Sequence, residues 1–147
     1  MAIAKAADPF FIPSAGAARG PNARIYVIFT DIAGTRAALS AAVRLGRGLD
    51  LPLLLLVARM TPYPLPLEDP PVSVEFSEHA MYELVRDLDA EIVVQILLCR
   101  EPEDALRDAL GPEALVVIGT GKSWWRPRYR KLARRLKADG RHLVLID

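Results

Sequence analysis

The clearest indication of the fold is the segment ALVVIGTGKS, residues 114–123. Five apolar residues run directly into two glycines, and a stretch rich in Lys and Arg follows. A short, unbroken apolar run is typical of a strand that is buried on both faces, as in a parallel sheet. Glycines after such a strand let the backbone turn tightly, and the next helix directs its N-terminal N–H groups at the same place. We therefore predict a strand, a turn and an anion-binding position within this segment.

Outward from this segment, apolar runs alternate with segments of helical periodicity. The predicted strands are residues 24–30, 52–58, 91–99, 114–118 and 142–146, and the predicted helices are 35–46, 74–89, a short one from Pro102, and 125–138. This alternation predicts an α/β fold in which a parallel sheet carries helices on both faces. The five prolines of residues 59–71 exclude a helix or a central strand there, which leaves either a stiff surface connection or a binding loop.

Composition places the chain among ordinary globular proteins. Its 147 residues are 52% hydrophobic and 25% charged, with a net charge of +1, so no overall field favours nucleic acid or a membrane surface. The single cysteine, Cys99, excludes an internal disulfide and fits a cytoplasmic location. No apolar run reaches the ~20 residues of a membrane helix, and we expect no export signal. We expect residues 1–23 to be an irregular arm and residues 24–147 to form one domain.

A ligand site is expected where the strand order of such a sheet reverses, beyond the carboxyl ends of the strands. With the first and fourth strands adjacent, three pieces of chain converge there: Asp31, the backbone after the second strand, and the glycine turn. A carboxylate accepts hydrogen bonds from an adenine amino group or a ribose, although Asp31 would equally cap the helix that follows. The predicted binding residues are Asp31, Val57, Ala58, Gly119, Thr120, Gly121, Lys122 and Ser123.

Other kinds of site find little support in the sequence. GTGKS resembles the end of a phosphate-binding P-loop, but Val116 stands where that motif needs its first glycine. His79 and His142 lack the spacing of metal ligands, and no serine lies in a nucleophile elbow, so we predict neither a metal site nor catalytic residues. The cations of residues 126–141 fit a solvated helix face or a protein contact better than nucleic-acid binding.

The chain resembles the universal stress protein family across residues 24–147. The resemblance lies in VIFTDIAGT (27–35), LLLLVA (53–58), VVIGTG (116–121), the basic helix and HLVLI (142–146). It implies a three-layer α/β/α domain with five parallel strands in the order 3-2-1-4-5. It also implies homodimers, often through the last strand, and in many members a bound ATP or AMP.

The chain departs from that family in its phosphate motif. Members that bind ATP carry a glycine, two residues, a second glycine, nine residues, and then Gly with Ser or Thr. From Gly119, the second glycine position is Lys122, and the later pair falls on Leu132 and Ala133. The resemblance therefore implies a non-enzymatic stress-response module with a degenerate adenine-nucleotide or anion pocket, holding ATP, AMP or no cofactor. The alternative is a protein-interaction domain that regulates a transporter or kinase without binding nucleotide.

Overall fold

The computed structural model describes residues 4–6, 10–12, 24–49, 51–111, 114–121 and 126–147, the first two ranges as backbone only. Its strands are β1 (Ala4–Ala6), β2 (Phe10–Ile12), β3 (Ile25–Ile28), β4 (Leu53–Met60), β5 (Ile92–Cys99), β6 (Leu115–Gly119) and β7 (His142–Ile146). Its helices are α1 (Ile32–Leu49), α2 (Val74–Val85), α3 (Pro102–Ala109) and α4 (Pro127–Ala138). These elements follow the predicted alternation of strands and helices.

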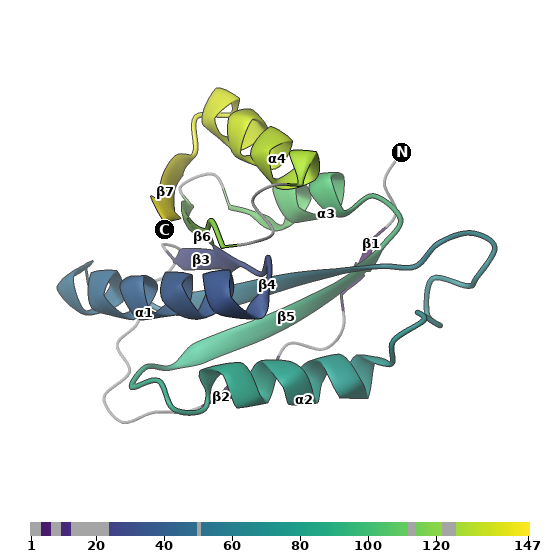
Figure 1. Ribbon diagram of the computed structural model, residues 1–147, viewed down its shortest axis with the longest axis horizontal. Helices are drawn as coiled ribbons and strands as arrows, with labels where there is room; N and C mark the ends of the chain where they lie inside the picture. Colours follow the sequence, from purple (N-terminus) through teal and green to yellow (C-terminus); the bar gives the residue numbers. More distant parts are fainter. Residues whose placement is uncertain (1–3, 7–9, 13–23, 50, 112–113, 122–125) are drawn as a thin grey trace.

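Five parallel strands form the centre of the sheet, in the spatial order β5-β4-β3-β6-β7. Counted along the chain, this is the predicted order 3-2-1-4-5, so the expected α/β fold is confirmed. Strand β3 lies between β4 and β6, because the chain continues from β3 to β4 and β5 on one side and then crosses to β6 and β7 on the other (Figure 1). The strand order reverses at this point, which is where such sheets bind their ligands.

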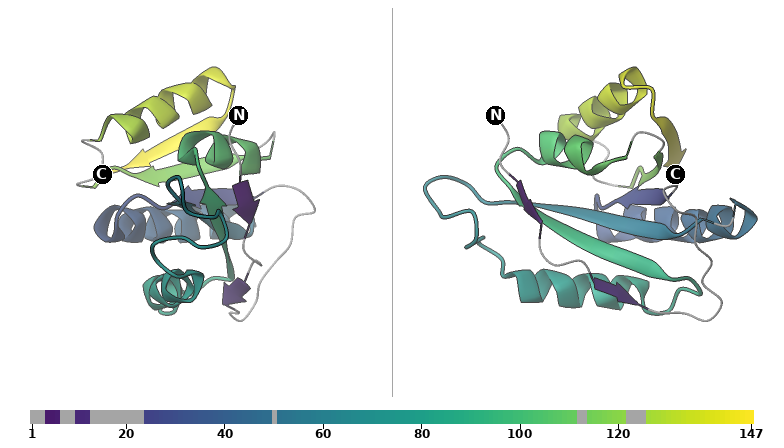
Figure 2. Two further views of the ribbon diagram at one scale, coloured as in Figure 1. Left: turned by 90° about the vertical axis from the view of Figure 1, so that its right-hand side faces the viewer. Right: turned by 180° about the vertical axis from the view of Figure 1, so that it is seen from behind.

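The helices cover the sheet in two layers, α1 and α2 on one face and α3 and α4 on the other (Figure 2). Alternate residues of β3 point into the two layers: Val27 packs in the core under α1 and α2, and Ile28 in the core under α3 and α4. Both side chains are fully buried, as are the central residues of β4 and β6. Burial on both faces explains why these strands are continuous apolar runs.

The N-terminal arm contains regular structure that its composition does not predict. The backbone of β1 pairs antiparallel with the end of β5, Ala4 opposite Cys99, and β2 pairs with its beginning, Phe10 opposite Val94. These two short strands cover the outer edge of β5, which would otherwise leave a row of N–H and C=O groups unpaired. The expectation of an irregular arm is therefore wrong for these six residues, and the rest of residues 1–23 lies outside the described part of the chain.

Several element boundaries differ from the predicted ones for local reasons. Helix α1 begins at Ile32, three residues early, because Asp31 caps it. Helix α4 begins at Pro127, where proline suits a first helical turn. Strand β4 continues to Met60 because its last residues still pair with β5, ending with Met60 opposite Cys99.

The proline-rich connection after β4 is fixed at its beginning. Thr61 donates its backbone N–H to the Cys99 carbonyl at 2.9 Å and its hydroxyl to the Leu67 carbonyl at 3.3 Å. Arg100 donates to the Thr61 carbonyl at 2.8 Å and stacks on the Tyr63 ring. Of the two predicted roles for this segment, these contacts favour a stiff surface connection over a binding loop.

Of the four helices described, none has the length and apolar character to cross a membrane.

Candidate functional site

Asp31 and Gly119 lie at the same edge of the sheet, as the sequence predicts. Strands β3 and β6 run parallel with Ile28 opposite Ile118, so the residues that follow them emerge side by side. The hydroxyl of Thr30, just beyond β3, donates to the Gly119 carbonyl at 3.2 Å and ties the two ends together.

The Asp31 carboxylate caps α1. Its Oδ1 accepts the N–H of Gly34 at 2.6 Å, and its backbone carbonyl accepts the N–H of Thr35 at 2.9 Å. This is the N-cap arrangement, in which a carboxylate satisfies an N–H that the first turn of a helix leaves open. Asp31 therefore has the capping role that the sequence offers as the alternative to binding a ligand.

The glycines after β6 are packed against the start of α1. A Cβ on Gly119 would lie 1.8 Å from the Gly34 carbonyl oxygen, and a Cβ on Gly121 would lie 2.9 Å from both carboxylate oxygens of Asp31. At Gly119 any side chain would displace the Gly34 backbone, and at Gly121 it would displace the Asp31 carboxylate. In this structure, the space beside both glycines is filled by this chain's own first helical turn.

The other predicted residues are spread around this edge. The hydroxyl of Thr120 donates to the Ile146 carbonyl at 3.1 Å, which directs it toward the end of β7. Val57 is fully buried in the core under α1 and α2, and Ala58 lines the pocket described next. Lys122 and Ser123 lie outside the described residues.

A pocket of about 190 Å³ opens at the carboxyl ends of β3 and β4, beside the N-terminal ends of α3 and α4. Its walls combine an apolar floor with several cationic side chains. The lining residues are Phe29, Thr30, Ala58, Arg59, Pro102, Glu103, Leu106, Arg126, Arg128, Tyr129 and Leu132. The first turn of a helix carries N–H groups with no intrahelical acceptor, so two such turns give this end of the sheet a positive potential.

Arg59 is the partly buried cation of this pocket. Its Nε donates to the Ser77 hydroxyl at 3.2 Å, and its guanidinium lies 5.4 Å from the centre of the Phe29 ring. Burial lowers the pKa of Arg59 below its ordinary value, and the nearby Tyr129 opposes that change. Within the described part of the chain no carboxylate pairs with this guanidinium. It nevertheless stays protonated at neutral pH, so the protein holds a poorly solvated positive charge here.

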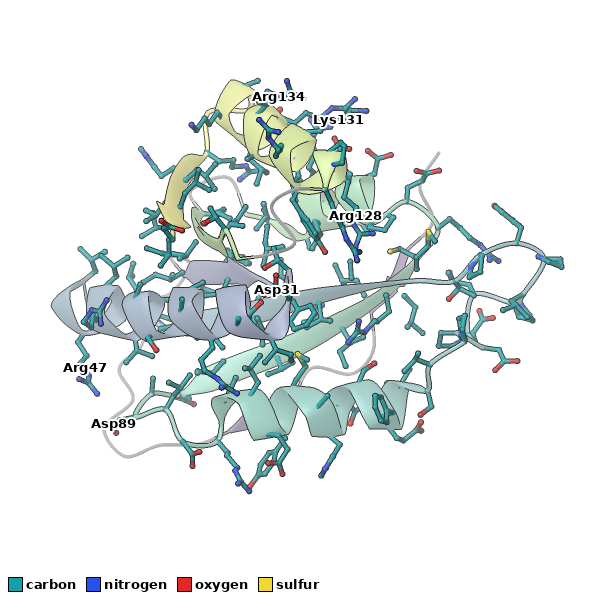
Figure 3. The ribbon with its side chains drawn as sticks, viewed as in Figure 1. Asp31, Arg47, Asp89, Arg128, Lys131 and Arg134 are labelled. Carbon is teal, nitrogen blue, oxygen red and sulfur yellow. The ribbon has the colours of Figure 1, made fainter. Side chains whose placement is uncertain are left out.

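Tyr129 and Arg128 form the wall on the α4 side. The Tyr129 hydroxyl donates to the Thr30 carbonyl at 3.4 Å and accepts a hydrogen bond from Arg128 Nη2 at 2.9 Å. The Arg128 guanidinium also lies over the Tyr129 ring, 4.8 Å from its centre. Figure 3 shows Arg128 at the end of α4 nearest the strand ends, while Lys131 and Arg134 extend away from the sheet. Tyr129 therefore holds the first turn of α4 against β3.

Three ion pairs hold α3 and α4 together beside the pocket. Glu103, the acidic residue of the lining, pairs with Arg135 at 2.9 Å, and Asp104 lies 4.0 Å from the same guanidinium. Arg107 donates from Nε and Nη2 to the two carboxylate oxygens of Asp139, both at 3.0 Å. The first pair offsets the charge of Glu103, so the positive character of the lining is retained.

The pocket lies at the edge of the sheet where the sequence predicts a ligand site, but most of its lining residues are not among the predicted ones. Arg59 directly follows the predicted Ala58. A cation at the carboxyl end of a central strand is the feature of the sequence from which Arg59 could have been predicted as a site residue. Tyr129 lies within the predicted last helix, and its side chain is buried. Its hydroxyl contact with Thr30 joins residues 99 positions apart, which no local pattern reveals.

We found no protein family, no curated protein and no solved structure that matches this chain.

Proposed function

We propose that the protein is a non-enzymatic regulatory module, of the kind that the universal stress protein family comprises, which binds an adenine nucleotide or another small anion. The pocket at the carboxyl ends of β3 and β4 is the binding site in this proposal. Binding would report the level of the ligand to a partner, and chemistry on the ligand is not required.

The observation that carries this proposal is the partly buried Arg59 with no carboxylate partner in the described part of the chain. A cation that has lost part of its hydration is less favourable unless an anion compensates it, so its position in a pocket supports an anionic ligand. The location adds to the argument, because parallel α/β sheets bind ligands at this edge.

Isothermal titration of the purified protein with ATP, AMP and a cyclic adenine nucleotide tests the proposal. We expect a saturable signal with at least one of them, and loss of that signal in an Arg59→Met variant that keeps the far-UV circular dichroism of the parent. If none of these nucleotides binds at millimolar concentration, the proposal that the ligand is an adenine nucleotide fails. A phosphate-release assay on the same samples tests the non-enzymatic part, since steady turnover of ATP would contradict it.

The same proposal includes a homodimer formed along β7. Within the described residues, β7 pairs with β6 on one side only. Leu145 on this strand is 40% exposed, which suits a contact between two copies. Sedimentation equilibrium of the parent and of a Leu145→Lys variant tests this, and a parent that stays monomeric at high micromolar concentration would contradict it.

A second candidate function is protein binding through α4, as the alternative from the sequence suggests. The exposed cations of this helix, Arg130, Lys131, Arg134 and Lys137, have no acidic partner among the described residues. Such a row favours an acidic partner surface. Capture of partners with a Lys131→Glu/Arg134→Glu variant tests it, and unchanged capture would count against it. Arg135 is left intact because it pairs with Glu103.

A further inference from the structure

We propose that the pocket recognises a diphosphate group, and that arginine side chains hold this group in place of a glycine turn. The inference rests on the proposed function, because it specifies which part of the anionic ligand the protein contacts. It follows from four features of the site: the space beside the glycines, the floor of the pocket, the charge of its walls, and its size.

The glycine turn after β6 is poorly suited to a phosphate. The Gly34 backbone occupies the space beside Gly119, and the Asp31 carboxylate lies against Gly121. A phosphate that approached from this side would have to displace the Gly34 backbone or the Asp31 side chain. The same carboxylate caps α1, so it is held in this position.

The floor of the pocket cannot form the second half of a backbone phosphate cradle. The positions where nucleotide-binding members of the resembled family carry Gly and Ser or Thr are Leu132 and Ala133, and both are buried in this structure. They lie in the second turn of α4, which begins at Pro127. N–H groups beyond the first turn are already bonded to carbonyls four residues back, so they cannot donate to a ligand. Leu132 presents an apolar side chain to the pocket instead.

The charge of the walls is suited to a ligand with about three negative charges. Arg59, Arg126 and Arg128 line the pocket, and none of them pairs with a carboxylate among the described residues. Glu103 lines it too, but Arg135 offsets its charge at 2.9 Å. Guanidinium groups bind phosphate oxygens through paired N–H donors, and several of them together favour a ligand with more than one phosphate. A diphosphate carries enough charge to satisfy all three.

The size of the pocket separates a diphosphate from a whole nucleotide. Pockets that enclose a drug-sized molecule occupy ~300–1,000 Å³. At about 190 Å³, this one encloses a compact group and leaves any attached sugar and base at the rim. Recognition therefore depends on the phosphates, and free pyrophosphate and the diphosphate end of a nucleotide share the chemistry that the pocket binds.

The experiment is a titration of the full chain with inorganic pyrophosphate, ADP, AMP and adenosine, in low-salt buffer with a chelator. Three variants accompany the parent: Arg59→Met, Arg128→Met and the control Arg47→Met. Arg47 is an exposed arginine that pairs with Asp89 at 2.9 Å, at the other end of α1 from Asp31 (Figure 3). Arg128 lies on the surface of α4, so this variant remains informative if Arg59→Met fails to fold.

We expect pyrophosphate and ADP to bind with dissociation constants within about fivefold of each other, AMP to bind about tenfold more weakly, and adenosine to give no signal. A charge-assisted hydrogen bond contributes about 1.5–3 kcal/mol, so Arg59→Met and Arg128→Met should each weaken pyrophosphate binding by about 10- to 100-fold. Arg47→Met should leave it unchanged.

The alternative outcomes are distinct. Binding of adenosine as tightly as ADP, with no binding of pyrophosphate, would overturn the diphosphate inference and leave a nucleotide pocket intact. Pyrophosphate binding that both pocket variants retain would overturn the assignment to these arginines. If none of the four compounds binds, the inference and the proposed function fail together.

Discussion

Replacing Gly119 by alanine tests the closest contact between the sheet and its first helix. The new Cβ would lie 1.8 Å from the Gly34 carbonyl oxygen and 2.3 Å from its carbonyl carbon. Ordinary contacts begin near 3.4 Å, so the two backbones would have to separate by about 1.5 Å. Such a movement disturbs the Asp31 cap on Gly34 and the hydrogen bond from Thr30 to Gly119, because Gly34 and Gly119 are the two residues that must move apart.

The expected loss of stability can be built from these contacts. Forcing a methyl group into a packed region costs about 1–3 kcal/mol and occasionally more. A lost N-cap adds about 0.5–2 kcal/mol, and a lost hydrogen bond adds about 0.5–1.5 kcal/mol. We therefore expect Gly119→Ala to lower the free energy of unfolding by about 3–5 kcal/mol, a large part of the ~5–15 kcal/mol that such a domain has.

Urea denaturation followed by circular dichroism at 222 nm measures this loss. With an m value near ~2 kcal/mol/M, the midpoint should fall by about 2 M urea. Gly48→Ala is the matched control, because nothing lies within 4 Å of a Cβ there and the residue is part of α1. It should be neutral or stabilise the fold by up to ~1 kcal/mol. A Gly119→Ala midpoint close to that of the control would refute the packing described for this edge.

Three further outcomes are expected. Asp31→Ala should lower the free energy of unfolding by about 1 kcal/mol and Asp31→Asn by less, because asparagine keeps an acceptor for the Gly34 N–H; equal losses in urea titrations would contradict the capping role. Burial, and secondarily Glu101, raises the pKa of Cys99 from 9.0 to about 11, so the folded state retains a proton that the unfolded thiol loses. Stability should therefore fall between about pH 9 and 11, and less steeply in Cys99→Ala; parallel pH profiles would count against this. A double-mutant cycle on Arg107 and Asp139 should give a coupling of about 0.5–1 kcal/mol that shrinks in 0.5 M NaCl, and a salt-independent value would point to packing instead.

The central sheet was predictable because its strands are buried on both faces. Strands β3, β4 and β6 are continuous apolar runs bounded by Gly, Pro or Asp, and this signal lies within each segment. The two strands of the N-terminal arm were not predictable in the same way. Each is three residues long, and each forms only because β5 offers an open edge. Pairing to a distant edge leaves no periodic pattern in so short a segment.

The edge of the sheet at which the candidate site lies was predictable, but the residues that line it were predictable only in part. The sequence indicated that Asp31 and Gly119 would emerge together, and they do. A glycine after a strand indicates that something approaches the backbone closely, without saying whether that is a ligand or the chain itself. Here Gly34 makes that approach. Arg59 and Tyr129 come together in the pocket through tertiary contacts alone, so local patterns could not assign them to it.

The backbone of β1 and β2 along β5 has a consequence for how copies of this chain can assemble. Among the strands described, the opposite side of the sheet ends in β7, whose outer backbone groups remain available. Two copies that join there would present β1 and β2 to a third copy, and each of these strands is only three residues long. Very short edge strands pair weakly, so such an assembly would stop at two copies instead of growing into a fibre.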